Sequence, residues 1–153
     1  MSNIFGFQKT ISHTIIIDSS KQQIWKALSN FSSYNKWNSL VPMASGHLLA
    51  GEKLKIQVSL PLSEPMNYQV IIVEVKENEH IEWLGHFKLP GLFDGLHSYR
   101  LSTISGNKTE LIHEERFRGL LVPFVWWSLG PKFNARFSES NERLKHFVES
   151  EVI

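Results

Sequence analysis

Alternation along two consecutive predicted strands turns polar side chains toward the interior of the protein. In the strand predicted for residues 108–118, Leu111 and Phe117 mark the apolar face, and side chains two residues apart share that face. The same period applies to the preceding predicted strand, residues 93–104. We therefore expect a cluster of polar side chains in the core, formed by His97, Tyr99, His113 and Glu115.

This cluster predicts either acid–base chemistry or the orientation of a ligand. A carboxylic acid beside a histidine in a dry pocket can move protons next to a carbonyl, which makes Glu115 with His113 or His97 the catalytic candidates. Alternatively, these groups satisfy one another's hydrogen bonds and only orient a bound molecule. Two histidines and a carboxylate could also hold a metal, but no supporting residues are apparent in the sequence. We predict no metal and no cofactor.

Aromatic side chains are predicted to line the same interior. The chain has ten Phe, five Trp and three Tyr residues, which supply large rigid surfaces for a core or a pocket wall. Trp83 and Phe87 share the inward face of the strand predicted for residues 80–89. The predicted ligand-binding residues are Trp83, Phe87, Phe93, His97, Tyr99, His113, Glu115, Phe117, Phe124, Trp126, Phe133 and Phe137.

One long helix is predicted for residues 131–149. Phe133, Phe137 and Leu144 recur at helical spacing, and Ser140 lies among them as a small residue where we expect free space. At about 1.5 Å per residue the helix would extend roughly 28 Å, enough to cross a curved sheet.

The segment before this helix, residues 120–127, is an uninterrupted apolar run. One face of a helix cannot hide eight consecutive apolar residues, so a ligand, a membrane surface, another subunit or the pocket must cover part of the run. The preferred interpretation is a pocket gate in which Phe124 and Trp126 face the cavity. The alternative is an ordinary packed connection between strand and helix.

The rest of the chain predicts two short helices and a series of strands. A β-branched run precedes serines that can cap a helix, and aromatic residues three apart follow it. After Pro42 the pattern changes to period two, with a hairpin expected across Gly51. The remaining predicted elements are strand 9–18, helix 21–30, helix 31–38 and strands 46–50, 52–60 and 67–76.

Composition excludes several classes of protein. The 153 residues fit a single ligand-binding domain, residues 1–153, and a net charge of +1 disfavours nucleic-acid binding. The absence of cysteine excludes disulfides and thiolate chemistry and fits a reducing compartment. No stretch is long enough to span a bilayer, and the beginning of the sequence is a poor secretory signal, so we expect a cytoplasmic protein without stable membrane insertion. The oligomeric state stays open.

Several short motifs follow one another in a characteristic order along these elements. They are Trp25, the aromatic segment 31–38, Gly46 and Gly51, Glu-Trp-Leu-Gly at 82–85, Asp-Gly-Leu-His at 94–97, residues 109–119 and Asn-Glu-Arg-Leu-Lys at 141–145. Together with the order of elements, they resemble the START-related helix-grip superfamily (SRPBCC), in particular its polyketide cyclase/dehydrase and lipid-transport branch. The resemblance runs from about residue 11 to residue 147.

The resemblance implies an α+β helix-grip fold. A curved seven-stranded antiparallel sheet would wrap around the long C-terminal helix, with two short helices after the first strand. An apolar cavity would lie between sheet and helix and open near residues 61–65, 89–93 and 120–129.

These observations predict binding of a hydrophobic small molecule, such as a lipid, a polyketide or an aromatic compound. We expect a cavity of about 300–1,000 Å³, the usual range for such sites. The first alternative is a cyclase or dehydratase that uses Glu115 with His113 or His97. A third is a protein- or membrane-interaction module that docks through residues 120–127.

Overall fold

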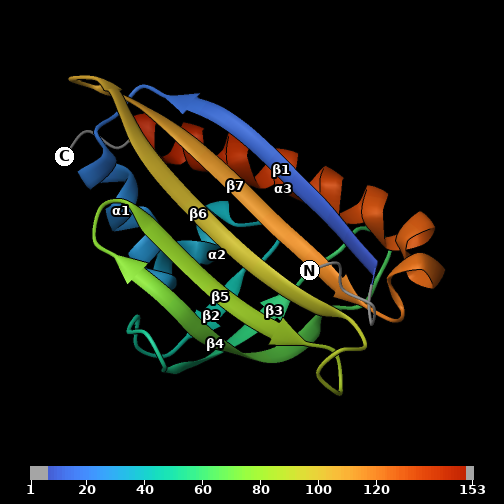
Figure 1. The fold of residues 1–153 in the computed structure, drawn as a ribbon. Helices are drawn as coiled ribbons and strands as arrows, with labels where there is room; N and C mark the ends of the chain where they lie inside the picture. The colour runs from blue at the N-terminus through green and yellow to red at the C-terminus, as the bar shows by residue number, and fades with distance from the viewer. Residues whose placement is uncertain (1–6, 151–153) are drawn as a thin grey trace.

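A curved antiparallel sheet and one long helix make up most of the protein (Figure 1). The computed structural model describes residues 7–150. The sheet has seven strands in the order β1-β7-β6-β5-β4-β3-β2, so the first strand pairs with the last. The strands are β1 (Phe7–Ile17), β2 (Met43–Ser45), β3 (Lys53–Val58), β4 (Met66–Lys76), β5 (His80–His86), β6 (Asp94–Ser105) and β7 (Lys108–Gly119). The helices are α1 (Lys21–Ser29), the 3-10 helix η1 (Phe31–Ser33), α2 (Tyr34–Trp37) and α3 (Val122–Ser150).

The short helices form where capping and aromatic residues predict them. The Ser20 side chain accepts a hydrogen bond from the backbone N–H of Gln23 and caps α1. After α1, the rings of Tyr34 and Trp37 pack edge to face with centroids 4.9 Å apart, and both side chains are buried. The aromatic spacing of this segment therefore reflects core packing.

Strand alternation turns the predicted faces inward. Leu111, His113 and Phe117 of β7 are all buried. In the register between β6 and β7, His97 lies opposite Glu115 and Tyr99 lies opposite His113. The polar residues of the two strands are thus neighbours on one face, as the sequence predicted.

The predicted hairpin of residues 46–50 with residues 52–60 is wrong. The strand that pairs with β3 is Met43–Ser45, and residues 46–52 form the connection between them. Gly46 has a φ of +135°, and a Cβ atom there would lie 2.9 Å from the carbonyl oxygen of Lys53. The tight approach at Gly46 ends the strand before the apolar residues of the loop can extend it.

Helix α3 begins at Val122, nine residues earlier than Pro131, where the sequence pattern placed its start. Proline is favoured in the first turn of a helix, and that preference misled the prediction. The apolar segment instead continues as helix through Pro131. It is anchored by burial of Val122 and by contact of the Trp126 ring with Phe117, at 5.2 Å between centroids.

The rest of α3 presents the predicted apolar stripe to the sheet. Phe133, Phe137, Leu144 and Val148 are buried at helical spacing. Within residues 7–150, no helix is long and apolar enough to cross a membrane.

Candidate functional site

An apolar cavity of about 80 Å³ lies between the sheet and α3. It is far smaller than the 300–1,000 Å³ expected from the usual size of ligand sites, so that prediction is wrong. Its lining residues are Leu40, Val41, Ile56, Val58, Met66, Tyr68, Val70, Trp83, Gly85, His86, Phe87, Phe93, Gly95, His97, Glu115, Phe117 and Phe133.

Aromatic rings fill most of the space that a larger cavity would need. The Phe117 ring contacts Phe133 at 4.7 Å and Phe93 at 5.3 Å between centroids. On the other side, the indole of Trp83 stacks on the His97 imidazole at 4.8 Å with an interplanar angle of 6°. The residual space is therefore bounded by flat rings and suits a flat group.

The predicted ligand-binding residues divide into three groups. Those around the cavity are Trp83, Phe87, Phe93, His97, Glu115, Phe117 and Phe133. Tyr99, His113 and Phe137 point inward as predicted but are fully buried behind the cavity wall.

The third group is Phe124 and Trp126, the residues of the predicted pocket gate. Phe124 is 72% exposed and points away from the cavity, and Trp126 packs beside Gly130 and Phe117. Because the segment is helical, its successive side chains point about 100° apart, and only part of the apolar run can face the core. The prediction that Phe124 and Trp126 face the cavity is wrong.

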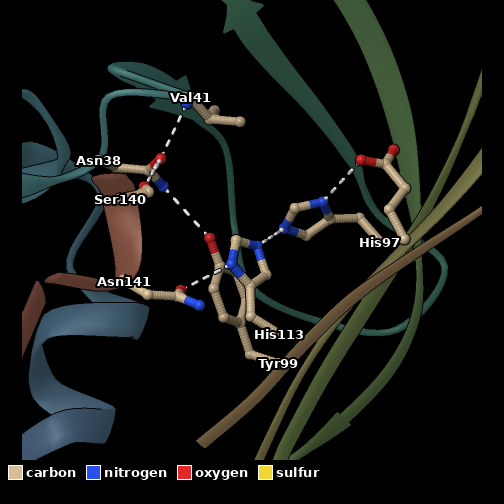
Figure 2. Close-up of polar contacts among 8 residues, drawn as sticks. Asn38, Val41, His97, Tyr99, His113, Ser140 and Asn141 are labelled. Atoms are coloured by element: carbon tan, nitrogen blue, oxygen red, sulfur yellow. Dashed lines mark hydrogen bonds and ion pairs between the residues drawn. The ribbon is translucent and has the colours of Figure 1, made fainter. Parts of the chain in front are cut away.

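A chain of hydrogen bonds runs from Glu115, which borders the cavity, through His97 and His113 to Asn141. Figure 2 shows the contacts of His97, His113 and Asn141. Glu115 Oε2 lies 3.2 Å from His97 Nδ1, and His97 Nε2 lies 2.9 Å from His113 Nε2. His113 Nδ1 lies 2.8 Å from Asn141 Oδ1 on α3. Two imidazoles thus connect the Glu115 carboxyl group at the cavity to helix α3.

The donors and acceptors of this chain fix how many protons it holds. An amide oxygen only accepts, so His113 donates to Asn141 from Nδ1, and neutral His113 accepts from His97 at Nε2. For the 3.2 Å contact of His97 Nδ1 with Glu115 Oε2 to be a hydrogen bond, one of these two atoms must also carry a proton. The pair is an imidazolium with a carboxylate or an imidazole with a carboxylic acid. Interconverting them needs only one short proton transfer.

The orientation of the Asn141 amide controls the number of protons that this hydrogen-bonded chain holds. Asn141 Nδ2 is buried and makes no hydrogen bond among the described residues. Rotating the amide by half a turn would let Nδ2 donate to His113 Nδ1, and His113 would then donate to His97 from Nε2. The chain would then hold one proton fewer.

A second polar branch occupies the position where the sequence predicted free space. Ser140 donates to Asn38 Oδ1 at 3.0 Å, and the backbone N–H of Val41 donates to the same oxygen at 2.8 Å. Asn38 Nδ2 in turn donates to the Tyr99 hydroxyl at 3.3 Å. Ser140 is fully buried and hydrogen-bonded, so the expectation of space around it is wrong.

His113 is held between two aromatic rings. Its imidazole stacks on Tyr99 at 4.3 Å and on Phe137 at 4.0 Å between centroids. Burial, and then the neighbouring His97, lowers the pKa of His113 well below its ordinary value of 6.5. Burial also raises the pKa of Tyr99 well above its ordinary value, so both groups are neutral near pH 7.

We expect this buried histidine to make stability depend on pH. Below pH 6.5 the unfolded chain protonates His113 while the folded chain keeps it neutral, so the unfolded state binds more protons and stability falls as the pH falls. The slope contributed by one such group approaches about 1.4 kcal/mol per pH unit. Urea denaturation of wild-type protein and the His113→Gln variant between neutral and mildly acidic pH measures it.

The variant should show a shallower pH dependence than the wild type. His47→Gln removes an exposed histidine and should leave the slope unchanged. Equal slopes for wild type and His113→Gln would contradict the assignment.

The absence of a side chain at Gly95 leaves room for the Glu115 carboxyl group. A Cβ atom on Gly95 would lie 2.6 Å from Glu115 Oε1. The obstructing atom is the end of a flexible side chain, so Gly95→Ala should displace the carboxyl group and leave the fold intact. We expect loss of the contact between the Glu115 carboxyl group and His97 Nδ1, visible as a shift of the His97 imidazole ¹⁵N resonances. Unchanged resonances would show that Glu115 does not need this space.

Sequence reasoning missed several residues around the site. Asn141 lies four residues after Phe137 on the buried stripe, which is the signal that could have identified it. Asn38 follows Trp37 at the end of the aromatic segment and had no such signal. Tyr68 of β4 also borders the cavity, and burial followed by the charge of Glu115 raises its pKa. Its hydroxyl therefore remains a proton donor.

The metal alternative has no support in the arrangement of these groups. Within residues 7–150, no group of three or more His, Asp or Glu side chains is placed to hold a metal ion. The imidazoles of His97 and His113 face each other through Nε2 and do not converge on a common point.

Comparison with known proteins identifies the fold. No protein-family model matches the chain, and no curated protein sequence does. The aromatase/cyclase Zhui from Streptomyces sp. R1128 has a TM-score of 0.76 at 11% identity, over 94% of each chain. Norcoclaurine synthase from Thalictrum flavum, in complex with dopamine and hydroxybenzaldehyde, has a TM-score of 0.71 at 12% identity, over 98% of this chain and 92% of that one. SA2116 from Staphylococcus aureus, a protein of unknown function, has a TM-score of 0.72 at 9% identity, over 97% and 98%.

The resemblance inferred from the sequence is confirmed at the level of fold. The chain has a helix-grip fold, which it shares with the Zhui aromatase/cyclase and norcoclaurine synthase structures. At 9–12% identity this similarity says nothing about which reaction or ligand is shared, because one fold serves many functions.

Proposed function

We propose that the protein binds a compact hydrophobic molecule, or one ring of a larger molecule, in the cavity beside Glu115 and His97. The observation that carries the proposal is an apolar cavity with a few polar groups at one side, which is the usual composition of a small-molecule site. Its volume of about 80 Å³ supports an aromatic ring rather than an extended lipid chain.

The side chains around the cavity suggest how such a molecule is held. Trp83 and Phe117 offer flat surfaces for a ring. Glu115 and the Tyr68 hydroxyl lie beside the cavity and can hydrogen-bond a carbonyl or hydroxyl group of the ligand. Norcoclaurine synthase, which has the same fold, was crystallised with the aromatic compounds dopamine and hydroxybenzaldehyde, and this supports an aromatic ligand class.

Binding of hydroxybenzaldehyde, followed by NMR titration, tests this proposal. The Val58→Phe variant fills the cavity from β3 and should abolish binding, whereas Val73→Phe makes the same change at an exposed position of β4 and should preserve it. Native mass spectrometry of freshly purified protein should also show a co-purifying apolar molecule. Absence of any bound molecule together with equal titrations of the two variants would refute the proposal.

Acid–base catalysis of the cyclase or dehydratase type is the second candidate. The position of Glu115 favours it, because a carboxylate that borders the cavity and contacts the His97 imidazole can take up a proton from a bound molecule and return it. In this step Glu115 would remove a proton from the carbon beside a carbonyl, and the electron pair would move to the carbonyl oxygen to form an enolate.

Deuterium exchange into phenylacetone in heavy water measures that step directly. Glu115→Gln should lower the exchange rate by about 10²–10⁴-fold, the usual contribution of a general acid–base group, without weakening binding. Glu114→Gln removes a neighbouring carboxylate that pairs with Arg116 and should have no effect. No exchange above the rate in buffer would exclude this activity for simple ketones and leave ligand binding as the function.

A further inference from the structure

Exposed apolar side chains gather at the end of the molecule where the cavity lies. The most exposed are Leu62, Trp127 and Phe124, at 100%, 80% and 72% of their surface. Isolated exposed apolar residues are common in proteins, but a group of this size marks an interaction surface. We define this mouth surface by Phe7, Leu62, Leu89, Leu120, Phe124 and Trp127.

Hydrogen bonds hold the segments of the mouth surface together. The backbone N–H of Leu120 donates to Gly91 at 3.0 Å, which joins the end of β7 to the loop between β5 and β6. Lys132 Nζ donates to Ser63 Oγ at 3.0 Å, which joins α3 to the loop between β3 and β4. Phe7 lies opposite Gly119 in the sheet. Residues distant in sequence therefore form one surface.

The charges around these residues are mostly positive. Lys9, Lys88, Arg118 and Lys132 lie in or beside the same segments. Glu64 is the exposed carboxylate of these segments, because Asp94 is turned toward His86 at 2.7 Å and toward the N–H of Gly91. Four basic residues thus face one exposed carboxylate here, whereas the whole sequence carries a net charge of only +1, so this end is more positive than the rest of the protein.

We propose that the mouth surface docks reversibly on an anionic lipid bilayer. Tryptophan and phenylalanine settle at the boundary between headgroups and acyl chains, and lysine and arginine beside them attract anionic headgroups. Both kinds of residue are required, since apolar contact or charge alone gives weak binding.

Docking in this orientation would turn the cavity toward the membrane. Met66, Phe87 and Phe93 line the cavity and belong to the strand ends and loops of the same end of the molecule. A hydrophobic molecule could then pass between bilayer and cavity without crossing water. The docking proposal stands on the surface residues alone and does not depend on the identity of any ligand.

Co-sedimentation with lipid vesicles tests the proposal. The protein should bind vesicles of equal parts phosphatidylcholine and phosphatidylglycerol, bind pure phosphatidylcholine vesicles far less, and dissociate as salt is added. Replacing Lys9 and Lys88 by glutamine should lower the affinity about fivefold per residue. Replacing Phe124 and Trp127 by glutamine, which preserves the helix, should abolish binding.

Matched variants keep the test specific. Lys53→Gln with Lys55→Gln removes two exposed lysines of β3, and Leu49→Gln with Ile104→Gln removes two exposed apolar residues at the opposite end of the sheet. Both controls should bind like the wild type. The proposal is overturned if anionic vesicles are not bound, if the controls lose as much binding as the mouth variants, or if light scattering shows a dimer that the Phe124 and Trp127 changes dissociate.

Discussion

Replacing Phe137 by alanine should lower the free energy of unfolding by about 3–5 kcal/mol, the largest effect we expect from a single core truncation. Phe137 is fully buried on α3, and its ring stacks on His113 at 4.0 Å and lies 5.6 Å from His97. The alanine variant would leave a void and would also free the imidazole that the ring holds in place. Urea denaturation measures the loss.

The exposed residue Phe124 on the same helix provides the matched control. Phe124→Ala should change the free energy of unfolding by less than about 1 kcal/mol, because little apolar area leaves water there on folding. The ¹⁵N resonances of His113 should shift in the Phe137 variant alone. Similar losses of unfolding free energy for the two variants would mean that Phe137 is not packed in the core between α3 and the sheet.

Gly119→Ala should destabilise the protein by roughly 2–5 kcal/mol, the combined cost of a strained backbone and an overpacked contact. Gly119 has a φ of +146°, a conformation that side chains disfavour. An added methyl group would also clash with the carbonyl oxygen of Leu92 and lie 2.9 Å from that of Gly91. Backbone atoms cannot move aside as a side chain can.

The expected result is loss of contact between the loop of residues 87–93 and the end of β7, in addition to lower stability. Limited proteolysis should cut this loop faster in the variant, and urea denaturation gives the change in free energy. Gly106→Ala is the control, because nothing lies within 4 Å of an added Cβ atom there. Equal proteolysis of the two variants would argue against a docked loop.

The strand faces and the helical stripe followed from the sequence by itself. Side chains alternate with a period of two in any strand, so the inward direction of His97, His113 and Glu115 needed no knowledge of their partners. The buried stripe of Phe137 and Leu144 followed in the same way from helical spacing. These are local rules, and they were sufficient for the fold class.

Only the tertiary structure decided where helix α3 begins and where strand β2 ends. A proline can begin a helix or lie within one, and packing of Trp126 against Phe117 selects the longer helix that includes Pro131. The close approach of Gly46 to β3 ends β2 earlier than the apolar pattern predicted. Contacts between distant segments outweigh local preference in both places.

The same reason explains what the sequence determined about the site and what it left open. It placed Glu115, His97 and His113 on one face, but their hydrogen-bonded chain also needs Asn141 from α3, more than twenty residues away along the sequence. The cavity volume of about 80 Å³ depends on how rings from β4, β5, β6, β7 and α3 pack together, and no local sequence pattern determines that packing. The sequence thus determined which side chains turn inward, and tertiary packing decided which of them meet and how little space they leave.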